Sequence, residues 1–301
     1  MTAIIDAAEL QGWMREQRRF TLIDVLPEEY FHAQRLPGAR RASVYEVTFL
    51  NQVGALGISP DGPVVLYGAG NGSLDSAVAA EKLERAGFRQ IYDFRGGRAA
   101  WAQSGATFEG DGSLPSAPRT PEDRRYSVNP DKSTLEWIGR NLNTTHRGTI
   151  RIDRGHVSIA GGELAGGQVA LDMRSIQNSN LENPAMRQML EAHLKSDDFF
   201  DVQRHPVAEL KILSAKRIPQ ATPGAPNYDM TAQLTVKGVS RSIAYPAIVS
   251  LAADGALTTV AQIEIDRTQW NVRYGSGHFF QMLGKHLVND AITLLAKIVA
   301  E

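Results

Sequence analysis

The sequence contains no cysteine among its 301 residues. This absence excludes disulfide bonds, thiolate metal sites and any thiol nucleophile. The seven histidines include no closely spaced pair such as H-x-x-x-H, which is the usual pattern of a helical zinc site. We therefore predict that the protein holds no metal ion.

Long apolar runs are also missing. The longest lie near residues 64–67 and 292–300, far short of the roughly 18 residues that a membrane-spanning helix needs. Residues 1–13 lack the basic segment and apolar run of a secretory signal. We therefore predict a soluble, cytoplasmic protein with no membrane span and with an unknown oligomeric state.

An excess of charge of one sign is absent as well. The chain has 32 Lys and Arg against 33 Asp and Glu, a formal net charge of -1. Its arginine pairs, at residues 18–19, 40–41 and 124–125, are scattered among acidic residues. Nucleic-acid binding usually requires a concentrated basic face. We therefore do not expect a nucleic-acid partner.

The length predicts two domains, and a change of composition near residue 107 separates them. Residues 109–124 are rich in proline, glycine, serine and charge, which is typical of a linker. In residues 1–108, predicted strands at 20–25, 64–67 and 91–94 alternate with helices at 7–17 and 76–86. This alternation predicts an α/β domain with a parallel sheet.

In residues 125–301 the apolar period changes to two. Seven or more alternating segments, including those around Leu135, Met173 and Met230, predict an antiparallel sandwich or barrel. A helical pattern interrupts them at residues 183–195, where Met186, Met189, Leu190 and Leu194 recur at helical spacing.

Three blocks of the first domain resemble the rhodanese family. They are LIDVLPEEY with LPGA (residues 22–30 and 36–39), VVLYGAGNGSLDSAVAAEKLERAGF (64–88) and GGRAAWAQSG (96–105). The resemblance implies a parallel α/β domain in which a loop cysteine accepts a sulfur atom as a persulfide. Backbone N–H groups of that loop stabilise the negative charge. The corresponding loop here is Gly68, Ala69, Gly70, Asn71, Gly72 and Ser73, with Gly68 at the cysteine's position.

Without the cysteine, the resemblance does not carry the activity with it. One hypothesis is a structural or partner-docking domain, and a second is a loop that still holds an anion through its backbone. A third is a sulfurtransferase-related or phosphate-handling enzyme that uses Ser73 or Asp75, although no histidine lies nearby in the sequence to activate a hydroxyl. Asp24 is interpreted as structural.

The second domain resembles the YceI-like family along nearly its whole length. Its most specific motif is LKSDDFFDVQRHP (residues 194–206), and YSVNPDKSTLEW (126–137), LTVKGVSRSI (234–243) and IDRTQWNVRYGSG (265–277) follow the family's order. The resemblance implies an eight-stranded, lipocalin-like barrel that holds a polyisoprenoid or a similar amphiphile, such as a quinone-like lipid. Small residues on the alternating rows would leave room for it: Val169, Ala208, Ala232 and Ala261.

A long ligand with a polar head also needs a few polar anchors at the barrel mouth. Ten residues are predicted to bind the ligand: His146, Arg147, Phe199, Phe200, Asp266, Arg267, Trp270, Arg273, Tyr274 and His278. Structural alternatives are core packing for the two phenylalanines, an ion pair between Asp266 and Arg267, and a barrel-end seal for Trp270 and Tyr274. The sequence thus predicts a non-catalytic lipid-binding protein without a resident cofactor; a scaffold with a filled barrel is the alternative.

Overall fold

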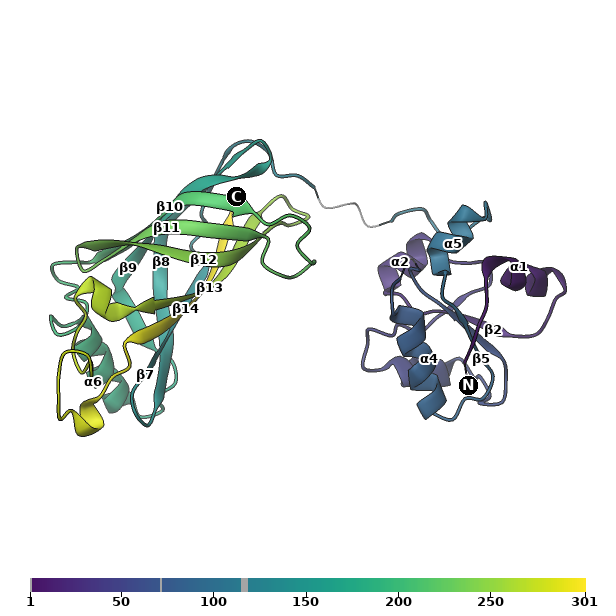
Figure 1. Ribbon diagram of the computed structural model, residues 1–301, viewed down its shortest axis with the longest axis horizontal. Helices are drawn as coiled ribbons and strands as arrows, with labels where there is room; N and C mark the ends of the chain where they lie inside the picture. Colours follow the sequence, from purple (N-terminus) through teal and green to yellow (C-terminus); the bar gives the residue numbers. More distant parts are fainter. Residues whose placement is uncertain (1, 71, 115–118) are drawn as a thin grey trace. The chain divides into compact units, whose positions relative to one another are not determined.

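The computed structural model describes residues 2–70, 72–114 and 119–301. The chain divides into two compact units, Met1–Ala117 and Pro118–Glu301. The first is the predicted α/β domain and the second the predicted barrel (Figure 1).

A five-stranded sheet forms the centre of the first unit, and all its pairings are parallel. The strand order is β1 (Ala3–Ile4), β5 (Ile91–Phe94), β4 (Val64–Tyr67), β2 (Thr21–Asp24) and β3 (Arg40–Arg41). The helices are α1 (Ala7–Arg15), α2 (Glu28–Ala33), α3 (Phe49–Ala55), α4 (Asp75–Arg85) and α5 (Gly97–Gln103). The strands and helices predicted from the sequence are therefore present, with ends shifted by one or two residues.

Both faces of this sheet are buried, because its strands are apolar at consecutive positions. Val64 and Leu66 of β4 pack with residues of α3 and α4. Val65 and Tyr67 of the same strand pack with Leu10 of α1 and with α5. The loop after β4 therefore begins at the carboxyl end of a central strand, between two layers of helices.

The second unit is a closed antiparallel barrel. The eight-stranded ring comprises β7 (Thr134–Arg140), β8 (Thr145–Ala160), β9 (Glu163–Asn178), β10 (Val207–Arg217), β11 (Tyr228–Val236), β12 (Val239–Leu251), β13 (Leu257–Asp266) and β14 (Ala291–Ala300). The pairing of β14 with β7 and of β8 with β9 closes it. Closure leaves few free strand edges, which protects a sheet of this size from edge-to-edge association.

A short strand, β6 (Arg125–Ser127), precedes β7 and lies between the same two neighbours. Its residues pair with the far half of β8, and Val128 forms a bridge with Ala300 of β14. Strands β6 and β7 therefore act as one interrupted strand. The interruption at residues 129–133 is an Asn-Pro turn in which the Asn129 side chain accepts hydrogen bonds from two following N–H groups.

One end of the barrel is covered by two segments between strands. The helix α6 (Pro184–Lys195) begins after Asn183, whose side chain accepts from the N–H groups of Ala185 and Met186. The second cover is residues 267–290, here termed the rim segment, which contains the short helices η1 (Arg267–Trp270) and η2 (Gly284–His286). Figure 1 shows both covers at the same end of the barrel, at the lower left.

The opposite half of the barrel interior is filled. Tyr228, Met230 and Tyr245 are all at most 9% exposed, and they pack there with neighbouring aliphatic side chains. Tyr126 closes this region, and its hydroxyl accepts from the N–H of Glu122. The barrel interior is therefore packed at one end, here termed the floor, and is covered at the other end by α6 and the rim segment.

At each end of the predicted linker, described residues form hydrogen bonds with the unit that adjoins that end in the sequence. Glu109 and Arg35 exchange two backbone hydrogen bonds, and the N–H of Gly112 donates to the carbonyl of Ala33. Near the other end, the Asp123 carboxylate accepts from the N–H groups of Gly161 and Gly162. Residues 109, 112 and 123 of the predicted linker, residues 109–124, are therefore hydrogen-bonded to the flanking units.

Candidate functional site

An apolar cavity of about 270 Å³ occupies the covered half of the barrel. Its wall is formed by side chains from β7, β8, β9, β10, β11, β13 and β14, including Trp137, Met173 and Ala208. Leu190 and Leu194 of α6 and several residues of the rim segment complete it. The volume lies just below the roughly 300–1,000 Å³ that is usual for small-molecule sites.

An aromatic cluster forms the roof of this cavity. His193 of α6 lies edge-on to both Phe199 and Tyr274, with ring centres 4.9 and 4.5 Å apart. Phe199 and Tyr274 are 5.3 Å apart. Trp270 is buried, and its indole N–H donates to the carbonyl of Leu234. These contacts attach α6 and the rim segment to each other and to the barrel wall.

Polar lining is concentrated at one side of the cavity, where it meets solvent. Arg140, Lys285 and His286 line it and are exposed. A bridge between Asn141 and Val288 joins the β7–β8 hairpin to the rim segment there. These residues form the mouth of the cavity.

His146 lies in the same hairpin and faces the cavity. Its Nε2 is 3.2 Å from the Thr144 hydroxyl, whereas its buried Nδ1 has no hydrogen-bond partner among the described residues. Burial lowers the pKa of His146, so the neutral ring is favoured. A buried polar atom without a partner costs free energy, and a ligand group that bonds this nitrogen would remove that cost.

Arg267 is buried, and its guanidinium donates four hydrogen bonds to the protein. It donates to the carbonyls of Val272, Val288 and Asn289 and to the carboxylate of Asp290. Burial lowers its pKa, and the Asp290 carboxylate opposes this shift. Arg267 therefore ties the two ends of the rim segment together.

In the first domain, the loop after β4 contains its own anion. Asp75, the first residue of α4, is buried, and its carboxylate accepts from the N–H groups of Ala69 and Ser76. A Cβ atom added to Gly68 would lie only 2.2 Å from that carboxylate. The Asp75 side chain thus occupies the space into which a side chain at position 68 would project.

The same loop is fixed on its other side by α5. The N–H groups of Arg98 and Ala99 donate to the carbonyls of Gly68 and Ala69. Gly70 has a φ of +83°, and a Cβ there would lie 1.9 Å from the carbonyl oxygen of Gly96. Only glycine fits this close approach. Of the predicted anion loop, Asn71 lies outside the described residues.

A second, more open cavity of about 590 Å³ adjoins Ala69 of this loop. Tyr30, Tyr45 and Phe108 line it together with Arg98, whose guanidinium donates to the side chain of Gln34. Burial and the nearby Asp75 carboxylate raise the pKa of Tyr45. Aromatic rings and one engaged cation therefore surround this cavity.

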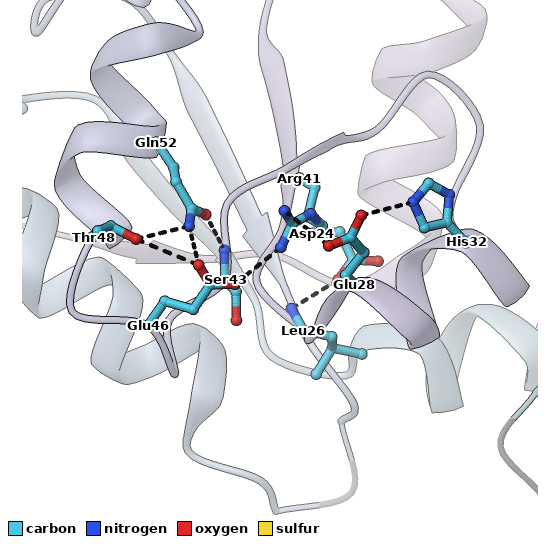
Figure 2. A network of polar contacts seen from close by, with 9 residues as sticks. All are labelled: Asp24, Leu26, Glu28, His32, Arg41, Ser43, Glu46, Thr48 and Gln52. Atoms are coloured by element: carbon cyan, nitrogen blue, oxygen red, sulfur yellow. Dashed lines mark hydrogen bonds and ion pairs between the residues drawn. The ribbon is translucent and has the colours of Figure 1, made fainter.

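The segment that carries Tyr45 is held by a network of polar side chains, which Figure 2 shows. Arg41 forms ion pairs with Glu46 (3.1 Å) and Glu28 (3.6 Å), and Gln52 donates to Glu46. The side-chain oxygen of Gln52 accepts from the backbone of Ser43. The network connects α2, β3 and α3 through ion pairs and hydrogen bonds at the protein surface.

Asp24, at the end of β2, is fully buried and bonded. Its carboxylate accepts from the Tyr67 hydroxyl (2.6 Å) and from the N–H of Leu26 (2.9 Å). The N–H of Leu36 donates to the same hydroxyl oxygen. Burial raises the pKa of Asp24, and the two hydrogen bonds oppose this shift. These contacts agree with a structural role for Asp24.

A profile of the YceI-like domain matches residues 126–300, which is more than half of the chain. The chain belongs to the YceI-like family. A rhodanese-like domain matches residues 6–104. The two resemblances identified from sequence motifs are thereby confirmed, and the barrel described above is the YceI-like domain.

Several solved structures are similar to this chain. BcnA of Burkholderia cenocepacia shares 21% identity, with 58% of this chain and 99% of that chain covered and a TM-score of 0.46. A polyisoprenoid binding domain from Saccharophagus degradans shares 15% identity, with 58% and 97% covered and a TM-score of 0.42. A YceI protein of Campylobacter jejuni shares 21%, with 54% and 84% covered and a TM-score of 0.36. A comparison with curated proteins gave no match.

Six of the ten residues predicted to bind a ligand line the cavity of the YceI-like domain: His146, Phe199, Phe200, Arg267, Trp270 and Tyr274. The structure thus brings together residues that lie more than 100 positions apart in the sequence. The two phenylalanines both pack at the barrel end and line the cavity, and their contact with a ligand stays a prediction.

The other four predicted residues lie outside this lining. Arg147 follows the inward His146 on β8 and is exposed, because consecutive strand residues point to opposite faces. Asp266 accepts from the N–H of Thr268 at the start of η1, and the ion-pair partner of Arg267 is Asp290 instead. The guanidinium of Arg273 lies over the ring of Phe279, and His278 contacts the same ring.

Several lining residues were not predicted as site residues, notably His193, Lys285 and His286. For Leu190 and Leu194 the sequence did indicate a shared apolar face, since they are four residues apart on a predicted helix. Met186 and Met189, which were placed on the same apolar face, are 53% and 66% exposed. The inward face of α6 is therefore narrower than predicted and includes His193.

Within the three described ranges, no group of three or more His, Asp or Glu residues is arranged to hold a metal ion. No helix in those ranges is long and apolar enough to cross a membrane.

Proposed function

We propose that the YceI-like domain carries one long-chain amphiphile, a polyisoprenoid or quinone-like lipid, and that the protein is not an enzyme. The observation that carries the proposal is the apolar cavity with one buried nitrogen, Nδ1 of His146, that has no hydrogen-bond partner among the described residues. Membership of the YceI-like family supports the same ligand class. The cytoplasmic location inferred from the sequence stays a prediction.

The distribution of polarity supports a defined ligand orientation. The apolar wall around Met173 and Leu194 would enclose a hydrocarbon segment, which is favourable in proportion to the area buried. Near the mouth, Nδ1 of His146 would form a hydrogen bond with a hydroxyl or carbonyl of the head group. The alternative of a scaffold with a filled barrel is less well supported, because only the floor half is packed.

The first domain is proposed to have a non-catalytic role, in docking a partner or positioning the carrier. The chain has no cysteine to accept sulfur. The Ala69 N–H, part of the predicted anion loop, already donates to Asp75. That bond weakens the case for a bound phosphate or sulfur anion in the loop.

The carrier proposal is tested by native mass spectrometry of the purified protein, followed by organic extraction and by titration with geranylgeraniol. We expect a bound long-chain species or saturable binding of the probe. Ala208→Leu, whose larger side chain would fill part of the cavity, should reduce binding at least about tenfold and keep the melting temperature.

Ala232→Leu is the matched control, because Ala232 is fully buried in the packed interior and outside the cavity lining. Overpacking should cost about 1–3 kcal/mol of folding stability and therefore lower the melting temperature. The affinity of the folded protein for the probe should be unchanged. Protein that carries no lipid and does not bind the probe would refute the carrier function.

A further inference from the structure

The rim segment presents large apolar side chains to solvent. Phe279 and Phe280 are 43% and 49% exposed, and Met282 is fully exposed. These three residues are here termed the apolar tip. Exposed apolar groups that cluster within four positions are unusual on a soluble domain, and they commonly mark an interaction surface.

The rim segment carries three basic residues and one acidic residue, Asp290, which pairs with the buried Arg267. Residues 267–289 contain Arg267, Arg273 and Lys285, together with His278 and His286, and no aspartate or glutamate. Arg267 is buried, which leaves Arg273 and Lys285 as exposed cations beside the apolar tip.

The apolar tip lies next to the mouth of the cavity. Lys285 and His286 follow it by three and four residues and line the cavity. Tyr274 contacts His193 of α6, a helix that also exposes Met186 and Met189. Figure 1 shows the rim segment and α6 projecting together from one end of the barrel.

We propose that the rim segment docks the cavity mouth onto an anionic lipid bilayer. Phenylalanine and methionine side chains would enter the headgroup boundary, and Arg273 and Lys285 would contact anionic headgroups. Two cations and three apolar side chains provide weak, reversible binding, unlike a spanning helix. The significance of this contact rests on the proposed carrier function, because it would let a lipid pass between bilayer and cavity without crossing water.

The experiment is sedimentation of the full chain with vesicles of phosphatidylcholine, alone or mixed in equal parts with phosphatidylglycerol. We expect binding to the mixed vesicles, much weaker binding to phosphatidylcholine, and a loss of binding when salt is raised to about 0.5 M. The triple variant Phe279→Ser, Phe280→Ser, Met282→Ser should bind at least about tenfold more weakly.

The charge requirement is tested with Arg273→Glu plus Lys285→Glu, which should also bind at least about tenfold more weakly. The matched control is Lys211→Glu plus Lys216→Glu, two exposed lysines of β10 on the barrel wall. It changes the net charge equally and should bind like the wild type. Leu213→Ser, also exposed on β10, is the control for the apolar tip.

Several outcomes would overturn the docking proposal. Wild-type protein could remain in the supernatant with anionic vesicles, or the β10 controls could lose binding as much as the rim variants. Self-association in analytical ultracentrifugation that the triple variant abolishes would instead assign the tip to a second copy of the chain. Vesicle binding does not need an occupied cavity, so Ala208→Leu should still dock; lipid loading without docking would refute only this inference.

Discussion

At the scale of single residues, Gly68 and Asp75 form a matched pair. The missing side chain at position 68 leaves the space that the Asp75 carboxylate fills, and the carboxylate accepts the N–H groups of Ala69 and Ser76. A negative charge at the start of α4 is also favoured by the helix dipole. The loop is therefore complete without an external anion.

Changing Gly68 alone should fail to create a reactive thiol. The new Cβ of Gly68→Cys would meet the Asp75 carboxylate, so the variant should lose about 1–3 kcal/mol of stability. Gly68 does not have a positive φ, so steric conflict rather than backbone strain is the cause. Urea unfolding of the first domain measures this loss.

Removing the carboxylate at the same time should expose the latent anion site. In Gly68→Cys/Asp75→Ser, stability should recover in part, and the thiol should have a pKa below the usual value of about 8.5. Iodoacetamide reaction rates against pH measure the pKa, with Ala55→Cys, at an exposed position at the end of α3, as the ordinary thiol. A normal pKa in the double variant would contradict the view that Asp75 replaces a bound anion.

At the scale of elements, the rim segment depends on one buried cation. Arg267→Met would leave the carbonyls of Val272, Val288 and Asn289 without their donor. Removing one partner of a buried polar group of this kind costs about 3–5 kcal/mol. Arg273→Ala, at an exposed site, should change stability by less than about 0.5 kcal/mol.

Guanidinium unfolding of both variants, followed by tryptophan fluorescence, checks this contrast. The sequence suggested head-group recognition for both arginines, and in that case both variants would lose ligand affinity without a difference in stability. Equal stabilities of the two variants would therefore argue against a structural role for Arg267.

Element type could be predicted where periodicity is regular, as in β7, β11 and α6. Strand β8 was not predicted as a strand, because its inward residues change phase. Ile150 and Ile152 face inward, and so do Val157 and Ile159, with register shifts between them. A β-bulge adds one residue and moves the apolar positions from even to odd, so the alternation is hidden in the sequence.

The site could be predicted in part for a related reason. His146, Trp270 and Tyr274 belong to motifs that resemble the family, and their residue types suit a mouth. His193 and Lys285 line the cavity only because α6 and the rim segment fold over the same barrel end. No local spacing encodes that long-range placement. The opposite directions of His146 and Arg147 follow from strand geometry, which a pair of adjacent residues does not reveal.

At the scale of the whole molecule, each unit has its own core and should remain folded alone. Trypsin should cleave first after Arg119, which is exposed. Arg124 lies over the ring of Tyr126, and Arg125 is in β6, so both should be cut later. Mass spectrometry of the early fragments checks the position of cleavage.

Arg119→Gln should slow this first cut and leave later cleavage unchanged. Circular dichroism of the separated fragments should show a parallel α/β domain and a β-barrel with independent melting transitions. Fragments that unfold on separation would indicate that each unit needs the other.

On the floor side, the described side chains fill the barrel, so the mouth is the route into the cavity. In the proposed carrier, a chain-like ligand would enter by its hydrocarbon end, because the polar residues stand at the mouth and the floor side is filled by Tyr228, Met230 and Tyr245. It must also leave by reversing the same route. Loading and release are then opposite directions of one path, so a single opening motion of α6 and the rim segment would set the rate of both. The head group would enter last and leave first, so it would stay accessible at the mouth to the acceptor of the ligand.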